Sequence, residues 1–321
     1  MRAILLKTVL LGFTLIVLTG AQSDCANTGV PGGMQGTPNN QDDTVGGKII
    51  AWGQSTVGQL SVESPNPGYK AIGCGEFHGM GIRESGKVKG WGFNQSSQTE
   101  PLPADNSNFI AVAGSHDHSI GLRSDGTVFA WGDNSPTLTA PPIPNENFTA
   151  IAACFSHNLG LKSDGSIVGW GFNTSGQLDV PAPNSGFVAV ACALRYSVGL
   201  KSDGSIVVWG DTADGRDMIP APNSGFTAIS TESSHILALR SDGSIAAWGG
   251  INSFGQLDVP TPNSGFIAVA AGSTHSAGLK SDGSVVVWGD NQFGQHDVPP
   301  PNSGFVAIAA GNFFTMGLKA P

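Results

Sequence analysis

The feature that most constrains this chain is a Trp-Gly pair that recurs at a nearly constant interval. All seven tryptophans of the 321-residue protein precede a glycine, and successive pairs lie 39 or 40 residues apart. The tryptophans are Trp52, Trp91, Trp131, Trp170, Trp209, Trp248 and Trp288. An aromatic residue that opens an apolar run keeps the same interval from Tyr69 to Phe305. Such a period identifies a repeat protein, in which each copy is one supersecondary unit.

Each repeat is predicted to consist of short strands joined by tight turns. Residues 266–271 alternate apolar and small side chains, and residues 275–280 and 285–288 continue the pattern, so three strands are expected. Asp282-Gly283 supplies the positive-φ turn that a tight hairpin requires. Residues 296–298 are interpreted as a short fourth strand at the outer edge, since the prolines that follow cannot donate hydrogen bonds to a neighbour.

These units predict an all-β fold, a seven-bladed β-propeller with four short antiparallel strands per blade. The repeat region, residues 48–319, begins with a third-strand block at residues 48–53 and ends with a first and a second strand at residues 305–319. The half that is missing at each end is present at the other. We therefore expect one blade to be shared between the two ends of the chain and to close the ring.

The N-terminal residues differ from the repeats. Residues 1–21 combine Arg2 and Lys7 with an apolar run at residues 8–18 and small residues after it, a pattern typical of a secretory signal peptide. The run is too short to span a membrane, which takes about 20 apolar residues. Residues 22–47 are rich in Gly, Asn and Pro and predict a flexible linker. The protein is thus expected to be exported to the periplasm, cell surface or surroundings, without stable membrane insertion after cleavage.

Charge and cysteine content narrow the function classes further. The net charge of −9, from 15 basic and 24 acidic residues, argues against a nucleic-acid partner, because affinity for phosphates comes from Lys and Arg. The four cysteines are spaced like no small cystine-rich framework, and Cys74, Cys154 and Cys192 fall where other repeats carry small residues. We expect buried thiols there, with disulfides as the alternative in an exported chain.

Five of the seven histidines occupy one repeat position, called the His position below. They are His78, His118, His157, His235 and His275, and Tyr196 and Phe314 replace them in the other two repeats. A position that accepts His, Tyr or Phe fills space, so these histidines and the seven tryptophans are predicted to be structural rather than metal ligands. Adventitious metal binding by His116 and His118 is the alternative. No catalytic motif is found, and no cofactor or metal is expected.

Recognition is expected where the loops depart from the repeat consensus, because the consensus carries the fold. The candidates before the His position are Phe77, Asp117, Phe155, Arg195, Glu232 and Phe313. A second set follows Trp-Gly and comprises Phe93, Phe172, Asp214-Gly215-Arg216, Phe254 and Phe293. Exposed Phe and Arg are favoured anchors of protein interfaces.

The unit Phe-x-Ala-x-Ala-Ala-Gly-x-x-His-Ser-x-Gly-Leu-Lys-Ser-Asp-Gly-Ser-x-x-x-Trp-Gly-Asp-Asn-x-x-Gly-Gln resembles the repeat of the regulator of chromosome condensation family, over residues 48–319. The resemblance implies a seven-bladed propeller that contacts proteins through loops on one face. The short units with Gln-x-x-Val-Pro are most similar to an exported bacterial branch, which includes a propeller-type beta-lactamase inhibitor protein. That inhibitor uses aromatic residues before the His position; only three of these loops carry one here, so a lactamase partner is not supported.

We therefore predict an exported, non-enzymatic and monomeric propeller that presents loop residues to an unknown protein partner. The first alternative is an exported propeller enzyme or carbohydrate-binding module with a site at the axial mouth. The second is a nucleotide-exchange factor like the family's eukaryotic prototype, which a signal peptide and an acidic chain argue against.

Overall fold

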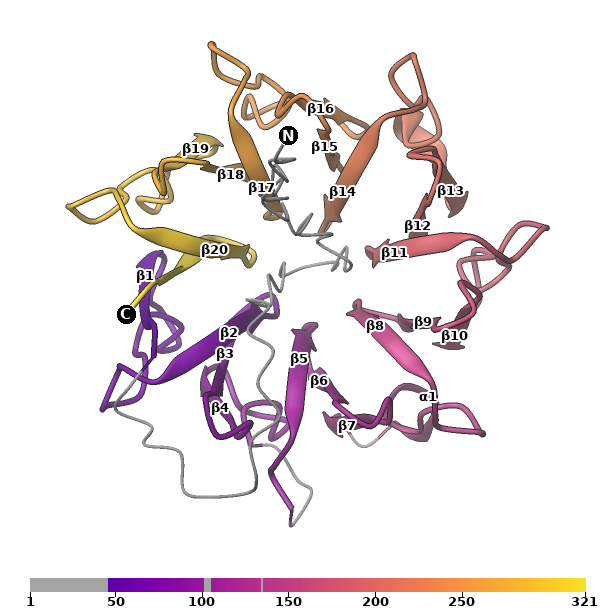
Figure 1. The fold of residues 1–321 in the computed structure, drawn as a ribbon, viewed down its shortest axis with the longest axis horizontal. Helices are drawn as coiled ribbons and strands as arrows, with labels where there is room; N and C mark the ends of the chain where they lie inside the picture. Colours follow the sequence, from indigo (N-terminus) through magenta and orange to yellow (C-terminus); the bar gives the residue numbers. More distant parts are fainter. Residues whose placement is uncertain (1–45, 101–104, 134) are drawn as a thin grey trace, which may run out of the picture.

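Seven antiparallel sheets of three strands each surround a central axis in the computed structural model, which describes residues 46–100, 105–133 and 135–321 (Figure 1). The predicted signal peptide and almost all of the predicted linker lie outside these residues. Within the linker, Gly47 pairs with Tyr69 as an isolated bridge next to the first strand. In the described part of the chain, no helix has the length and apolar character needed to cross a membrane.

The strands follow the repeat. The first six blades along the chain are β2 (Tyr69–Cys74), β3 (His78–Arg83) and β4 (Val88–Gly92); β5 (Phe109–Gly114), β6 (His118–Arg123) and β7 (Val128–Gly132); β8 (Phe148–Ala153), β9 (His157–Lys162) and β10 (Ile167–Gly171); β11 (Phe187–Cys192), β12 (Tyr196–Lys201) and β13 (Ile206–Gly210); β14 (Phe226–Thr231), β15 (Ile236–Arg240) and β16 (Ile245–Trp248); β17 (Phe266–Ala271), β18 (His275–Lys280) and β19 (Val285–Gly289). Two short helices, α1 (Pro136–Thr139) and η1 (Ala213–Gly215), lie in loops.

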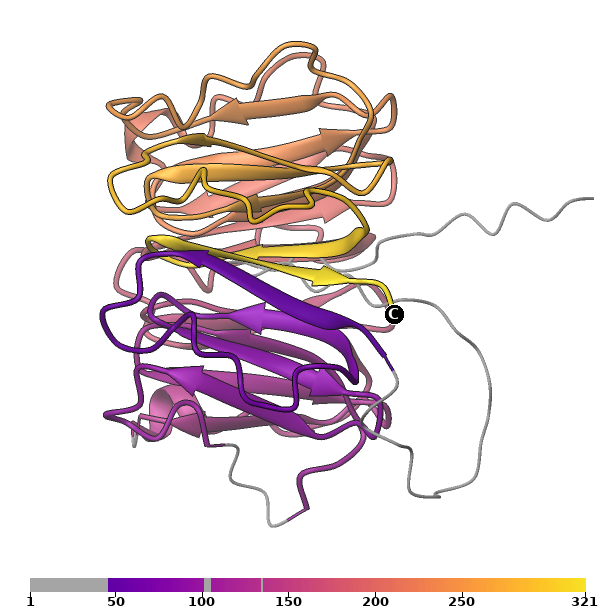
Figure 2. The same ribbon diagram turned by 90° about the vertical axis from the view of Figure 1, so that its left-hand side faces the viewer.

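The ends of the chain share the seventh blade, as predicted. β1 (Lys48–Gly53) pairs along its whole length with β21 (Phe314–Lys319), from Lys48 opposite Lys319 to Gly53 opposite Phe314, and β21 also pairs with β20 (Phe305–Ala310). Figures 1 and 2 show β1 beside the C-terminal strand. Because the ring closes this way, no sheet is left with half of its strands missing.

The predicted fourth strand is wrong. No strand forms at residues 296–298, where the Val298 amide donates to the His296 carbonyl at 2.8 Å and the Asp297 amide donates to the Gly294 carbonyl. Their backbone groups are therefore used locally. The three prolines that follow have no N–H with which to continue a ladder.

An asparagine side chain takes the place that a fourth strand would occupy at each outer edge. In the blade of β17–β19, the Val285 amide donates to Oδ1 of Asn302 and Nδ2 of Asn302 donates to the Val285 carbonyl, both at 2.8 Å. The equivalent asparagines are Asn66, Asn106, Asn145, Asn184, Asn223 and Asn263. One primary amide thus satisfies a donor and an acceptor that the edge strand would otherwise leave unpaired.

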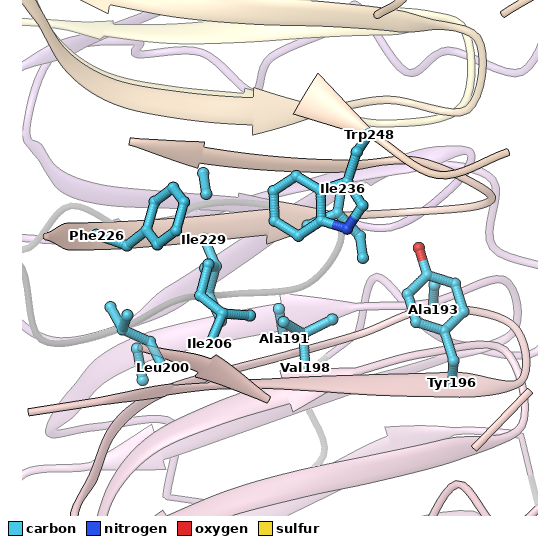
Figure 3. Packing of buried hydrophobic residues seen from close by; sticks show 12 residues of the cluster. Ala191, Ala193, Tyr196, Val198, Leu200, Ile206, Phe226, Ile229, Ile236 and Trp248 are labelled. Carbon is cyan, nitrogen blue, oxygen red and sulfur yellow. The ribbon is translucent and has the colours of Figure 1, made fainter. Parts of the chain in front are cut away.

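The apolar core lies between adjacent blades. Figure 3 shows one interface, where Trp248 of one blade packs with Tyr196 and Ile206 of the preceding blade. The Trp248 indole N–H donates to the Arg216 carbonyl at 2.9 Å. The other six tryptophans make the same kind of bond to Gln295, Gln59, Gln98, Leu138, Gln177 and Gln256. Each tryptophan therefore contributes apolar area and satisfies its own N–H.

Cys154 and Cys192 are buried as predicted, but they are not free thiols. They form a disulfide with a Cα–Cα distance of 5.9 Å, which links β11 to the loop between β8 and β9. The two residues are 38 positions apart, about one repeat, so the bond crosses a blade interface. Cys74 is also buried and is not free either. The thiol prediction is thus corrected, because residues spaced by one repeat become neighbours only when adjacent blades pack.

Candidate functional site

The loops before the His position and the loops after Trp-Gly lie at the same end of the ring. The antiparallel pairing of β18 and β19 places His275 opposite Gly289, so both loops leave the sheet together. They are joined by backbone bonds, such as Asp290 N–H to the Thr274 carbonyl at 3.0 Å. The two predicted sets of recognition residues therefore form one surface, called the loop face below.

Beneath the loop face, the five histidines of the His position are buried and connect adjacent blades. The Nε2 atom of each lies 2.8 or 2.9 Å from a side-chain oxygen of the next blade: His78 from Ser119, His118 from Asn158, His157 from Ser197, His235 from Ser276 and His275 from Thr315. These contacts give the His position a structural role at the blade interface.

The hydrogen bonds also fix which ring nitrogen carries the proton. The Ser197 hydroxyl donates to the Gln177 carbonyl at 2.9 Å. Because a hydroxyl has one proton to give, it accepts from His157, whose Nε2 is therefore protonated. Burial lowers the pKa of His157 and His275 to about 3, so these rings are neutral near pH 7.

The described residues bring together no complete set of metal ligands. His118 uses Nδ1 for the Ser115 hydroxyl and Nε2 for Asn158, so it cannot share a metal with His116. The Sγ atoms of Cys154 and Cys192 and a ring nitrogen of His157 lie within 4.8 Å of one another. The two sulfurs are joined in a disulfide, however, and zinc is bound by thiolates.

An aromatic cluster occupies part of the loop face. Phe77 and Phe93 each contact the His116 ring, with centroids 5.6 and 5.9 Å apart, and His116 contacts Phe155 at 5.8 Å. Phe77 and Phe93 also contact each other in an edge-to-face arrangement. Of the predicted recognition residues, the structure thus brings Phe77, Phe93 and Phe155 together. His116, which is not among the predicted recognition residues, contacts all three of them.

The other predicted residues on this face make different contacts. Phe313 packs against Phe293 with ring centroids 5.2 Å apart. Oδ2 of Asp117 lies 2.9 Å from Nδ1 of His116. Arg195 is exposed, and no ion pair holds it among the described residues. Phe155 and Phe172 remain 50% and 47% exposed, so large apolar area is open to solvent here.

A cavity of about 220 Å³ lies at the centre of the loop face. Its rim is formed by residues two positions before the His position, which we call the axial ring: Glu76, His116, Phe155, Leu194, Ser233, Ser273 and Asn312. All of these except His116 line the cavity, and Glu232 adds to the lining. Glu76 departs from the repeat consensus in the same loop as Phe77, but neither Glu76 nor Leu194 is among the predicted recognition residues. The signal that could have found them is their shared repeat position.

Glu232 lies in this cavity rather than at the surface expected of a loop residue. It is only 7% exposed, and its Oε2 atom has no hydrogen-bond partner among the described residues. Burial, and then the neighbouring Glu76, raise the pKa of Glu232 well above its usual value. Burial also raises the pKa of Glu76; the nearby Asp117 raises it further, and the nearby His116 acts in the opposite direction.

Fold and site define a class, the seven-bladed propellers whose loop-bearing face surrounds a central cavity. Four segments match the regulator of chromosome condensation (RCC1) repeat, at residues 69–98, 109–135, 148–177 and 266–295. The chain therefore carries RCC1-type repeats, as its sequence had suggested. No curated protein sequence matches it.

Solved structures share the architecture. Prp20p from Saccharomyces cerevisiae is 16% identical, with a TM-score of 0.72 over 86% of this chain and 92% of that chain. Human WBSCR16 is 17% identical, with a TM-score of 0.65 over 85% of this chain and 98% of that one. The ectodomain of the Arabidopsis thaliana receptor kinase ACR4 is 23% identical, with a TM-score of 0.63 over 77% of this chain and 90% of that chain. At these identities the likeness establishes the fold.

Proposed function

We propose that this chain is an exported, non-enzymatic propeller that binds a protein partner through its loop face. The observation that carries the proposal is the aromatic cluster of Phe77, Phe93, His116 and Phe155 beside further half-exposed phenylalanines. Contiguous apolar area on a monomer's surface marks an interaction site, and aromatic side chains are enriched in interface hot spots.

The opposite end of the ring supports the choice of face. There the hairpin turns consist of residues such as Ser202-Asp203-Gly204-Ser205, in which Asp203 accepts hydrogen bonds from the amide and the hydroxyl of Ser205. These turns satisfy their own polar groups and carry no large apolar side chain. The hairpin turns themselves offer a partner little apolar area, and the exposed Ile143 at that end is aliphatic, whereas the loop face offers aromatic anchors.

The size of the central cavity favours protein contact over the alternative of an axial enzyme site or carbohydrate site. A small-molecule site usually occupies about 300–1,000 Å³ and covers most of its ligand. The cavity here holds about 220 Å³ and opens into a broader aromatic surface. In structural relatives the same fold contacts proteins: Prp20p has binding properties toward Gsp1p and histones, and it has been seen bound to Kap60.

Export is supported by two independent features. The first is the charged, apolar and small-residue pattern of residues 1–21. The second is the Cys154–Cys192 disulfide, since disulfides persist in oxidising compartments outside the cytosol. The likeness of the repeats to an exported bacterial branch of the family agrees with both, and we extend the proposal to that branch.

Affinity capture with matched variants tests the proposal. The test variant, Phe155→Ser/Phe172→Ser, removes two half-exposed rings from the loop face. The control, Ile143→Ser, removes a side chain that is 96% exposed at the opposite end of the ring. Its place there follows from the next residue, Pro144, whose carbonyl accepts a hydrogen bond from Lys162 at the end of β9. A captured protein is then purified, and its affinity for each variant is measured by calorimetry.

We expect the double variant to bind at least about 30-fold more weakly, as for loss of a hot spot worth about 2 kcal/mol. The control variant should bind like the wild type. Equal binding by the wild type and the double variant, with loss in Ile143→Ser, would place the interface on the opposite end and contradict the proposal.

A further inference from the structure

The central cavity has chemical features that the aromatic surface around it lacks. Six of its lining residues belong to the axial ring, so they come from six different blades and meet only at the axis. Phe155 and Leu194, which are 50% and 44% exposed, form an apolar part of the lining. Glu76 and Glu232 contribute the only ionisable groups in the lining, and among the described residues no lysine or arginine takes part in it.

The fold does not require Glu232. It stands three residues before the His position, where the other six blades carry Gly75, Ser115, Cys154, Ala193, Gly272 and Gly311. A glycine or alanine is therefore sufficient for the blade geometry. Burying a carboxyl group without a partner for Oε2 costs free energy, because the group loses its hydration. A ligand that donates to Oε2 would recover that loss.

Charge identifies the ligand class. Two neighbouring carboxyl groups in one cavity disfavour each other's ionised form, and a cation bound between them relieves this repulsion. A metal ion is a poor match, because calcium takes 6–8 oxygen ligands and an apolar ring and a leucine occupy part of the lining. In the described part of the chain, the cavity brings together only two His, Cys, Asp or Glu side chains that could ligate a metal, Glu76 and Glu232.

A lysine side chain fits each of these features. Its ammonium group has three donors for Glu76, Glu232 and the Ser or Asn oxygens of the lining, and its methylene stem can pack against Phe155 and Leu194. We propose that the axial cavity binds a primary alkylammonium group, supplied by a lysine that the protein partner inserts. This inference rests on the proposed function for its source of lysine, but the binding of the ammonium group itself is independent of it.

The first test uses n-butylammonium as a probe for the lysine side chain, titrated into the isolated mature protein and followed by NMR chemical-shift changes. Saturable binding to the wild type is expected, and Glu232→Gln and Glu76→Gln should each weaken it at least 10-fold. Glu146→Gln, at an exposed carboxylate outside the cavity, should leave it unchanged. 1-Pentanol, a neutral molecule of similar shape, should not bind.

Several results would overturn the inference. Absence of saturable n-butylammonium binding in a folded wild type would do so, as would equal binding by Glu232→Gln and Glu146→Gln. Calcium or magnesium that binds more tightly than the probe, with the same dependence on Glu232, would identify a metal site instead. Two carboxyl variants keep the test informative if one of them fails to fold.

A second test separates this inference from the proposed function. Once a partner has been purified, its lysines are acetylated, and its affinity for the wild type and for Glu232→Gln is measured. Loss of affinity on acetylation for the wild type alone supports an inserted lysine. A partner that depends on Phe155 and Phe172 but not on Glu232 or acetylation would leave the proposed function intact and refute the lysine source.

Discussion

The Cys154–Cys192 disulfide yields the most quantitative prediction. The bond closes a loop of 38 residues across a blade interface. For a loop of this length, the chain-entropy relation gives a stabilisation of about 4 kcal/mol at 25 °C through restriction of the unfolded state. Removal of the bond should therefore lower the free energy of unfolding by about this amount, provided that the folded blades keep their packing.

The chain itself supplies the substitution that preserves packing. The position of Cys192 is occupied by Ala153, Ala271 and Ala310 in other blades, and that of Cys154 by Ala193. All four alanines are buried at blade interfaces. The double variant Cys154→Ala/Cys192→Ala thus introduces residues that this backbone already accommodates, so most of the measured change should come from the cross-link rather than from a cavity.

The assay is guanidinium unfolding of the oxidised proteins, followed by tryptophan fluorescence and circular dichroism. Coincident transitions by the two probes establish a single cooperative unfolding step, for which a free energy is defined. The single variant Cys192→Ala serves as a control, since it breaks the same bond and should lose a similar free energy. Reductant is avoided because Cys74 is not free either.

A double variant as stable as the wild type would refute the reasoning. So would alkylation of Cys154 and Cys192 in the unreduced, denatured wild type, since that result would mean that the bond is absent. A loss well above 4 kcal/mol would show instead that the sulfur atoms also contribute to packing in the folded state.

Three further predictions follow from the fold and the cavity. Trp52→Ala should lower the free energy of unfolding by about 3–5 kcal/mol, because Trp52 is buried in the closing blade and donates to the Gln295 carbonyl. Asn302→Ala should cost about 1–3 kcal/mol, because both backbone groups of Val285 lose their partner; chemical denaturation measures both losses. Glu232→Gln should raise the melting temperature increasingly as pH rises above about 4.5. The reason is that the pKa of Glu232 is higher in the folded state than in the unfolded state. The contribution of this carboxyl to stability is therefore greatest below its pKa in the unfolded chain, and it is lost as pH rises towards its pKa in the folded protein. Thermal melts from pH 4 to 8 test this.

Each of these predictions has a contrary outcome. A loss below about 1 kcal/mol for Trp52→Ala would mean that β1 does not close the ring in solution. If Asn302→Ala proved as stable as the wild type, water would have replaced the amide at the edge. Parallel pH profiles for the wild type and Glu232→Gln would show that this carboxyl is hydrated in the folded state.

Local chemistry made much of the fold predictable. The predicted strands at residues 266–271 and 275–280 match β17 and β18, and the third is β19 without its last residue, Gly289. These strands and turns depend on local signals. Apolar and small residues alternate along each strand, and the glycine of the Asp-Gly turn has a positive φ, so a few neighbouring residues are enough to predict them. The shared seventh blade could also be predicted from the sequence, because the two incomplete repeats at the ends complement each other.

The outer edge of the blades shows where local patterns mislead. Residues 296–298, with the prolines that follow them, were predicted to form a short edge strand, yet no strand forms there. The side chain of Asn302 takes the place of such a strand, since its amide group hydrogen-bonds both the N–H and the carbonyl of Val285 on the edge strand. Strand propensity describes the conformation that a segment favours by itself. Whether a segment pairs with an edge strand depends also on which other polar groups can bond the free N–H and C=O groups of that strand.

The sequence by itself determined the number of blades, the first three strands of each, the closure of the ring and the equivalent positions in every repeat, but not that each blade stops at three strands. The tertiary structure alone decided which of those positions meet. Loop residues of many blades come together near the axis, and residues one repeat apart meet at the blade interfaces, because seven blades share one centre. Hence Cys154 and Cys192 are bonded, Glu76 and Glu232 share one cavity, and two sets of loops form a single face.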